Sequence, residues 1–124
     1  MNVFFEEFGI GHLRNKQTSR LSGGERRRCE IALIFACRPR IVLLDEPFAG
    51  IDPIAVGDLK AAIRHLASLG VGVLITDHYA RELLSLVDRA YVISSGRVLS
   101  DGTPEALMSD SVVRQIYLGE HFQI

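Results

Sequence analysis

The 124-residue sequence has few lysines and no long apolar run. The first shortage bears on phosphate-binding loops and the second on membrane-spanning helices. Lys16 and Lys60 are its only lysines, and neither lies in a G-x-x-x-x-G-K-[ST] phosphate-binding loop. The longest unbroken apolar stretch, Ile31 to Cys37, is far shorter than the roughly 20 residues that a membrane-spanning helix needs. No basic-then-apolar leader opens the chain. We therefore expect a soluble product that associates with a membrane through a protein partner.

Cysteine spacing and net charge narrow the possible functions further. Cys29 and Cys37 have no C-x-x-C spacing, which favours buried, reduced thiols over a metal or redox motif. The formal net charge of −1 gives no electrostatic attraction to nucleic acid or anionic lipid. Three consecutive arginines, Arg26 to Arg28, lie between Glu25 and Glu30 and indicate a solvated helix face with local ion pairs. We therefore expect no nucleic-acid partner.

Apolar runs alternate with helical periods, a pattern that predicts an α/β fold with a largely parallel sheet. A helix should begin after Leu21–Glu25 and end near Cys37, and the run Ile41–Leu44 should form a strand buried on both faces. Asp52 is a candidate N-cap for a helix that ends at Gly70. The later pattern predicts a strand over 71–76, a helix over 79–87, strands over 91–93 and 97–99 around a Ser95–Gly96 turn, and a short helix capped by Thr103.

The first segment suited to phosphate chemistry is Ser22-Gly23-Gly24, which directly precedes a predicted helix. Two glycines let the backbone come close to a ligand, and a helix N-terminus offers unpaired N–H groups and a partial positive charge. The serine hydroxyl adds a further donor. The alternative is an ordinary turn in which Ser22 is only the N-cap of the helix.

The second segment is the acidic pair Asp45-Glu46 at the end of the predicted strand. Ligands bind at the carboxyl ends of strands in α/β sheets, and two adjacent carboxylates there are costly without cations or hydrogen bonds. We expect Asp45 to hold Mg²⁺ through a water molecule and Glu46 to orient or deprotonate an attacking water. The alternative is a solvated acidic loop.

The third segment is Asp77-His78, which follows the strand predicted over 71–76. If the two strands are neighbours in the sheet, His78 lies beside Glu46 and can reach a terminal phosphate. A histidine at a strand end is otherwise most often a polar cap.

The order and spacing of these segments resemble the ATPase domains of ATP-binding-cassette (ABC) transporters. Leu21–Glu25 is similar to the signature sequence LSGGE, Ile41–Pro47 to the Walker B segment, Ala49–Asp52 to the D-loop and His78 to the switch histidine. The resemblance runs from about Phe8 to the end of the chain. It implies the C-terminal part of an ABC-type P-loop NTPase. Residues 1–38 would then be the end of the helical subdomain with the signature helix, and residues 39–124 part of the RecA-like core with C-terminal helices.

The resemblance also implies cofactors, partners and residue roles. ABC proteins sandwich two ATP molecules with Mg²⁺ between two ATPase subunits, which implies a homodimer joined to transmembrane permease subunits at the cytoplasmic face of the inner membrane. Ser22, Gly23 and Gly24 would hold the γ-phosphate of ATP bound on the opposite subunit, and Asp52 would cross the interface. Asp45 as metal ligand, with Glu46 and His78 as catalytic residues, would act on ATP bound to their own subunit.

Within the family, four stretches are most similar to the lipopolysaccharide-export ATPases: GERRR, DEPFAGIDPI, LITDH and YLGEHF. The YLGE sequence is also similar to branched-chain amino-acid importer ATPases. Two residues depart from the pattern. Leu33 stands where many relatives carry arginine, which should alter a packing or salt contact. Tyr79 stands where export ATPases carry asparagine, which should alter how the following helix docks.

The absence of a P-loop leads us to expect that this chain alone neither binds ATP tightly nor hydrolyses it. An aromatic base-stacking segment and a Q-loop, which family members carry upstream, are also missing. The missing P-loop strand would leave an apolar sheet edge exposed and stability marginal. Val3, Phe4, Phe5 and Phe8 are typical of an amphipathic helix cut from a larger subdomain. The alternatives are a catalytically silent remnant that only dimerises, and an ABC protein of the DNA-repair type, which the lack of heptads disfavours.

Overall fold

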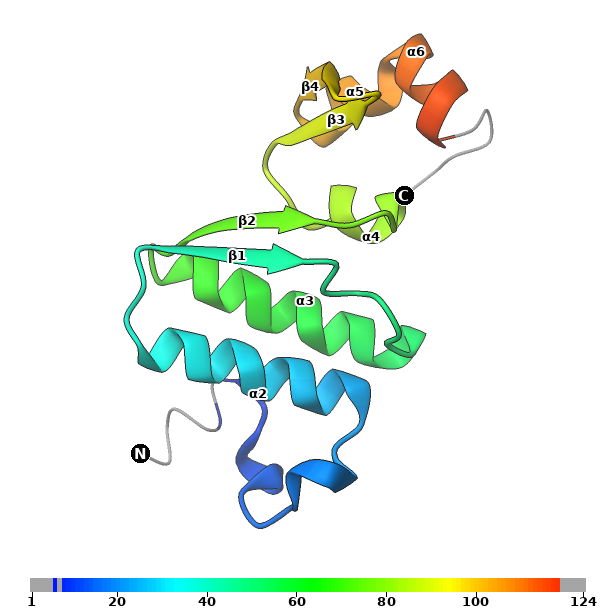
Figure 1. Ribbon diagram of the computed structural model, residues 1–124. Helices are drawn as coiled ribbons and strands as arrows, with labels where there is room; N and C mark the ends of the chain where they lie inside the picture. Colours follow the sequence, from blue (N-terminus) through cyan, green and yellow to red (C-terminus); the bar gives the residue numbers. More distant parts are fainter. Residues whose placement is uncertain (1–5, 7, 119–124) are drawn as a thin grey trace. The chain divides into compact units, whose positions relative to one another are not determined.

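The chain folds into two units, Met1–Asp77 and His78–Ile124, in a computed structural model that describes residue 6 and residues 8–118. Figure 1 labels the elements of both units. The helix predicted around Val3–Phe5 and most of the YLGEHF stretch lie outside the described residues.

The first unit opens with two short 3-10 helices, η1 (Gly11–Leu13) and η2 (Thr18–Arg20), which lead into helix α2 (Gly23–Ala36). Ser22 is the N-cap of α2, which is the role given above as the alternative to a phosphate-binding corner. The helix ends at the C-cap Cys37, because Arg38 adopts a positive φ of 51° and Pro39 follows. The predicted helix is therefore confirmed.

A β–α–β segment forms the rest of the first unit. Strand β1 (Ile41–Asp45) and strand β2 (Gly72–Thr76) pair in parallel, and helix α3 (Pro53–Ser68) connects them. The register runs from Ile41 opposite Gly72 to Asp45 opposite Thr76. Asp52 caps α3 with Pro53 in its first turn, and Gly70 with φ 83° follows the helix, as predicted. The two predicted strands are thus confirmed and are direct neighbours.

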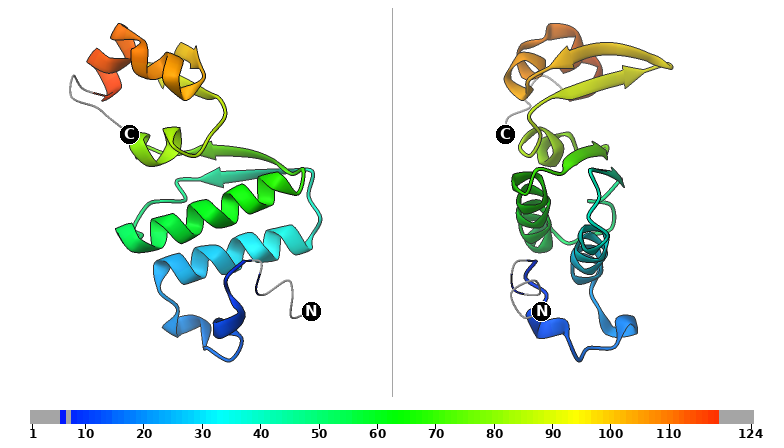
Figure 2. Two further views of the ribbon diagram at one scale, coloured as in Figure 1. Left: turned by 180° about the vertical axis from the view of Figure 1, so that it is seen from behind. Right: turned by 90° about the vertical axis from the view of Figure 1, so that its left-hand side faces the viewer.

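Helices α2 and α3 pack side by side on the same side of this sheet (Figures 1 and 2). The side chains that fill the space between them are almost completely buried, including Leu59 and Leu66 of α3 and Ile31 of α2. Phe8 extends this core, because its ring lies 5.4 Å from that of Phe35 and 5.3 Å from that of His65, between centroids. The core of the first unit is therefore formed mainly by two helices and one sheet face.

The opposite face of the β1–β2 sheet is exposed, so the prediction that β1 is buried on both faces is wrong for this chain. Val42 is 3% exposed on the helix-covered face, whereas Ile41, Leu43 and Leu74 are 68%, 70% and 58% exposed. Side chains alternate between the two faces of a strand. No element among the described residues 8–77 of the first unit covers the second face, and its apolar side chains are exposed.

The second unit contains a β-hairpin and short helices. Strand β3 (Ala90–Ser94) pairs antiparallel with β4 (Arg97–Gly102), and the predicted turn residues Ser95 and Gly96 both have positive φ. Helix α4 (Ala80–Leu84) is shorter than predicted, and α5 (Pro104–Ser109) is capped by Thr103 as predicted. The sequence patterns did not predict helix α6 (Ser111–Val113) and the π-helical turn η3 (Arg114–Leu118).

A small core holds the second unit together. Leu84, Leu107 and Val113 are buried there, and Val92 of β3 packs against them. Helices α5 and α6 therefore lie against one face of the hairpin, while Tyr91, Ile93 and Val98 remain exposed.

Two predictions for individual side chains on or next to α2 are wrong. Cys37 is exposed rather than buried, because it lies at the open C-terminal end of the helix, and only Cys29 is half-buried. Arg28 is 9% exposed and pairs with Asp58 of α3, whereas Arg27 pairs with Glu30 on the helix surface at 2.9 Å as expected. Leu33 is 69% exposed, so no packing contact within the described residues depends on it, and a changed salt contact at this position stays a prediction.

Across the described part of the chain, no helix is both long and apolar enough to cross a membrane.

The exposed sheet face predicts self-association that charged side chains should relieve. Leu43 and Leu74 are directly opposite each other in the register, so Leu43→Glu with Leu74→Lys places opposite charges across the strands. We expect this double variant to stay monomeric at concentrations where the unmodified chain self-associates, with its unfolding free energy changed by less than about 1 kcal/mol. Sedimentation velocity and urea unfolding measure the two quantities. Val42→Glu, on the buried face of the same strand, should instead unfold the protein. If the double variant associates as strongly as the unmodified chain, the exposed leucines do not cause the self-association.

Candidate functional site

The glycine corner at the start of α2 presents an exposed serine held by a capping box. The Ser22 Oγ accepts a hydrogen bond from the Glu25 N–H at 3.2 Å, and the Glu25 carboxylate accepts one from the Ser22 N–H at 2.8 Å. Ser22 and Gly23 are exposed, whereas Gly24 is buried. Because Oγ accepts in the cap, its own hydroxyl proton is available for an external acceptor. The corner therefore offers a hydroxyl donor and a helix N-terminus to solvent.

A lysine from the preceding loop anchors the same capping box. The Lys16 Nζ donates to both Glu25 carboxylate oxygens at 2.8 and 2.9 Å, and the imidazole Nε2 of His12 lies 3.7 Å from Glu25. The hydrogen bond from Lys16, followed by that from the Ser22 backbone, lowers the pKa of Glu25 from 4.5 to about 2. Glu25 is therefore a charged link between the loop and the helix N-terminus.

The acidic pair lies at the carboxyl end of β1, beside the end of β2. The Thr76 Oγ1 donates to the Asp45 carboxylate across the two strands, and the Glu46 N–H donates to the Thr76 carbonyl at 2.7 Å. Glu46 has a φ of 45°, in the left-handed region that non-glycine residues rarely adopt. Both carboxylates are exposed. The strand end thus turns sharply and presents two adjacent acids to solvent.

The loop after the acidic pair is fixed to β2 by Asp77. The Asp77 Oδ2 accepts a hydrogen bond from the Phe48 N–H at 3.0 Å, and Phe48 is buried. The Ala49 N–H donates to the Glu46 carbonyl at 3.1 Å, which closes a turn directly after Glu46. The sequence patterns do not predict these positioning roles of Thr76 and Asp77, because the roles depend on the register between strands about 30 residues apart in the chain.

The carboxyl ends of β1 and β2 and the N-termini of α2 and α3 lie at the same end of the first unit (Figures 1 and 2). Asp52 lies there as the N-cap of α3, where its Oδ1 accepts hydrogen bonds from the N–H groups of Ile54 and Ala55 at 3.1 and 3.0 Å. The structure therefore brings the acidic pair, Asp52 and the Ser22 corner to one end of the unit. Helix N-termini at that end favour anions.

His78 is the first residue of the second unit, and its ring packs on that of Tyr79. The two ring centroids are 4.3 Å apart with an interplanar angle of 35°. Both side chains are exposed. Tyr79 is the N-cap residue of α4, so the tyrosine at this position packs on the histidine in front of its helix. The expected proximity of His78 to Glu46 stays a prediction.

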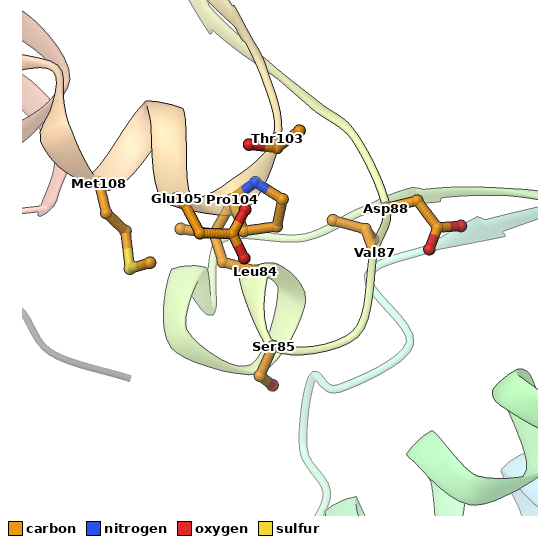
Figure 3. Close-up of a pocket in the computed structure, with 8 residues that line it drawn as sticks. All are labelled: Leu84, Ser85, Val87, Asp88, Thr103, Pro104, Glu105 and Met108. Carbon is orange, nitrogen blue, oxygen red and sulfur yellow. The ribbon is translucent and has the colours of Figure 1, made fainter.

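A pocket in the second unit, of about 540 Å³, lies apart from all of these predicted residues in sequence. Figure 3 shows the residues that line it, drawn from α4, α5 and the segments next to them: Leu84, Ser85, Val87, Asp88, Thr103, Pro104, Glu105 and Met108. None of the predicted site residues contributes to it. The pocket therefore gives no support to the predicted phosphate chemistry and does not argue against it.

The side chains that could bind a metal ion can be compared with the ligands that Mg²⁺ requires. Within the described residues no group of three or more histidine, cysteine or acidic side chains could hold a metal ion. Mg²⁺ with a nucleotide, however, is commonly held by one or two carboxylates together with phosphate oxygens and water. A single exposed carboxylate, Asp45, oriented by Thr76, fits that kind of site. It does not fit a site made of protein ligands alone.

Comparison with known proteins gives close matches in sequence. The profile of a family described as ABC transporter matches residues 1–49. A probable ABC transporter ATP-binding protein of Azorhizobium caulinodans is 57% identical over all of this chain and 44% of its own length. The lipopolysaccharide export system ATP-binding protein LptB of Escherichia coli is 52% identical over 99% of this chain and 51% of its own length. The chain thus spans about half the length of the curated relatives it matches.

Solved structures of ATP-binding cassettes also match this chain. The ADP conformation of MJ1267, an ATP-binding cassette of an ABC transporter, matches with a TM-score of 0.83 and 28% identity, over 96% of this chain and 48% of that chain. CbiO1 of Clostridium perfringens, part of the ABC transporter complex cbiONQ, matches with a TM-score of 0.78 and 31% identity, over 95% of this chain and 48% of that one. The fold described above is therefore similar to about half of an ATP-binding cassette.

The lowered pKa of Glu25 predicts acid sensitivity of the glycine corner. Because the folded-state pKa lies below the ordinary 4.5, the stabilisation is complete above pH 4.5 and is lost as the pH falls toward 2. We expect Lys16→Met to raise the Glu25 pKa and to flatten this part of the stability profile, as followed by NMR of the carboxyl carbon and by urea unfolding. Lys60→Met, which removes the only other lysine, should leave the Glu25 titration unchanged. An unaltered Glu25 pKa in the Lys16 variant would refute the assignment.

Proposed function

We propose that this chain supplies the signature segment and the acidic pair of a transport ATPase, because it belongs to the family of ABC transporter ATP-binding proteins. One observation carries the proposal. Asp45 and Glu46 lie at the carboxyl end of strand β1, which pairs in parallel with the strand that leads directly into His78, at the same end as the exposed Ser22 corner. This is the arrangement that a nucleotide sandwich between two subunits requires.

The residue roles follow from the chemistry of each group. Ser22 and Gly23 would donate hydrogen bonds to the γ-phosphate of ATP held by a second subunit, since both are exposed at a helix N-terminus. Asp45, oriented by Thr76, would be a ligand of Mg²⁺ that accompanies ATP on its own subunit. When bound, Mg²⁺ would neutralise charge on the phosphate oxygens.

Glu46 would act as the general base. Its backbone is held in the left-handed region by hydrogen bonds on both sides, which fixes the carboxylate at the tip of the strand. A carboxylate there would orient a water molecule and accept its proton as the water attacks the terminal phosphate. His78 would contact the same phosphate, and Asp52 would extend across the subunit interface.

We further propose that the transported substrate is lipopolysaccharide. The relatives of Escherichia coli and Haemophilus influenzae, both 52% identical to this chain, are named for lipopolysaccharide export. These matches favour export over the alternative of branched-chain amino-acid import. Partners would be a second ATPase subunit and transmembrane permease subunits, and the place of action the cytoplasmic face of the inner membrane.

Hydrolysis would require a phosphate-binding loop from outside these 124 residues. The purified chain alone should therefore release no more phosphate from ATP than its Glu46→Gln variant. Phosphate release by the unmodified chain above that control would refute the requirement for another segment. It would also mean that the half of each relative that this chain matches can hydrolyse ATP without the other half.

A fused protein tests the positive part of the proposal. We expect the N-terminal half of the Escherichia coli relative, joined to this chain, to hydrolyse ATP in the presence of Mg²⁺. Glu46→Gln should reduce the rate by about 10²–10⁴-fold, the range for loss of a general base. Glu30→Gln, which breaks only a surface ion pair with Arg27, is the matched control and should retain the activity. Equal activity of the two variants would overturn the role of Glu46.

A further inference from the structure

Helices α2 and α3 touch without an intervening side chain at Gly24. A Cβ atom placed on Gly24 would lie 2.5 Å from the Cβ of Ala55 and 3.6 Å from the Cγ2 of Ile51. Two carbon atoms are normally in contact at roughly 3.5–4.0 Å, so residue 24 cannot carry a side chain unless α3 moves. Gly24 is also buried, unlike Ser22 and Gly23. The contact therefore explains a glycine at this position without any ligand.

Contacts on both sides of Gly24 continue the same interface. A Cβ atom on Gly23 would lie 3.3 Å from the carbonyl oxygen of Gly50, in the loop that leads to Asp52. One turn further along both helices, Arg28 pairs with Asp58. Residues three or four apart share a helix face, so Gly24 and Arg28 face Ala55 and Asp58 along one line. The α2–α3 interface thus begins at the glycine corner itself.

Ala55 connects this interface to Asp52. The Ala55 N–H donates to the Asp52 Oδ1 at 3.0 Å, as part of the N-cap of α3. A shift of Ala55 would therefore shift the donor that orients the Asp52 carboxylate. On the other side of the contact, the capping box ties Ser22 to the first turn of α2. The close packing of Gly24 on Ala55 consequently links the Ser22 corner to Asp52, beside the approach of Gly23 to the Gly50 carbonyl.

We infer that Gly24 is a positioning residue, which fixes the Asp52 carboxylate relative to the Ser22 corner by packing directly on Ala55. Its functional meaning rests on the proposed nucleotide sandwich, in which both groups face the second subunit. The inference itself concerns only contacts within this chain. It can therefore be tested without nucleotide, separately from the ATP hydrolysis experiments.

Exchanging the two residues tests the inference in the 124-residue chain. Gly24→Ala should lower the folding equilibrium constant about tenfold or more, because it overpacks the interface. Ala55→Gly alone should lower it by about fivefold, the cost of a helical glycine. The double variant moves one methyl group from α3 to α2 and should fold better than Gly24→Ala alone. Gly57→Ala, on the same helix with no atom within 4 Å of the new Cβ, should raise the constant.

A second measurement separates positioning from simple stability. NMR of the Ala55 amide and the Asp52 carboxyl carbon reports the N-cap directly. Gly24→Ala should shift both signals, the double variant should return them, and Gly57→Ala should leave them unchanged. A double variant that unfolds as readily as Gly24→Ala, or N-cap signals that do not respond to Gly24→Ala in folded protein, would overturn the inference. If Gly24→Ala does not fold at all, recovery of the fold in the double variant supports it.

Discussion

Parallel pairing of β1 with β2 is the constraint on which the candidate site depends. The register sets Asp45 opposite Thr76 and brings Glu46 beside Asp77, so that two strand ends supply hydrogen bonds to one acidic turn. Without that pairing, the left-handed backbone at Glu46 would have no carbonyl of Thr76 to receive its N–H, and such a conformation is costly for a residue with a side chain. The position of the carboxylates is therefore a consequence of sheet geometry rather than of the acidic residues themselves.

Helix α3 transmits this geometry to the glycine corner. It connects the two paired strands, and its first turn packs against the first turn of α2 at Ala55 and Gly24. The Arg28–Asp58 pair lies one turn further along, in a largely buried position for the arginine. The Asp58 side chain is 65% exposed, so only removal of Asp58 would leave a buried charge, that of Arg28, without its partner. The two helices consequently keep a fixed relation, and with it the relation between the corner and the strand ends.

The sequence predicts helix caps from neighbouring residues, but it does not predict contacts between residues that lie far apart in the chain. The caps formed by Asp52 and Thr103 follow from residue types beside each helix start, and both were predicted. The N-cap role of Ser22, which the structure shows, was only the alternative to a phosphate-binding corner. The burial of Arg28 depends on Asp58, which lies 30 residues away on another helix. Arg28 therefore looked like part of a solvated face until its partner was known. For the same reason the sequence did not show that the atom closest to the missing side chain of Gly24 belongs to Ala55, and its ligand role stays a prediction.

The exposed face of β1, which was wrongly predicted to be buried, is also the face that carries the acidic end of the strand. Its apolar run is typical of a strand covered on both sides, yet Leu43 and Leu74 lie in water. Side chains alternate along a strand, so Leu43 shares its face with Asp45, and Leu74 shares that face with Thr76. Any segment that covers the two leucines must therefore also come close to the hydrogen-bonded pair of Asp45 and Thr76. One period-two pattern therefore places the exposed leucines and the hydrogen-bonded pair of Asp45 and Thr76 on the same face of the sheet.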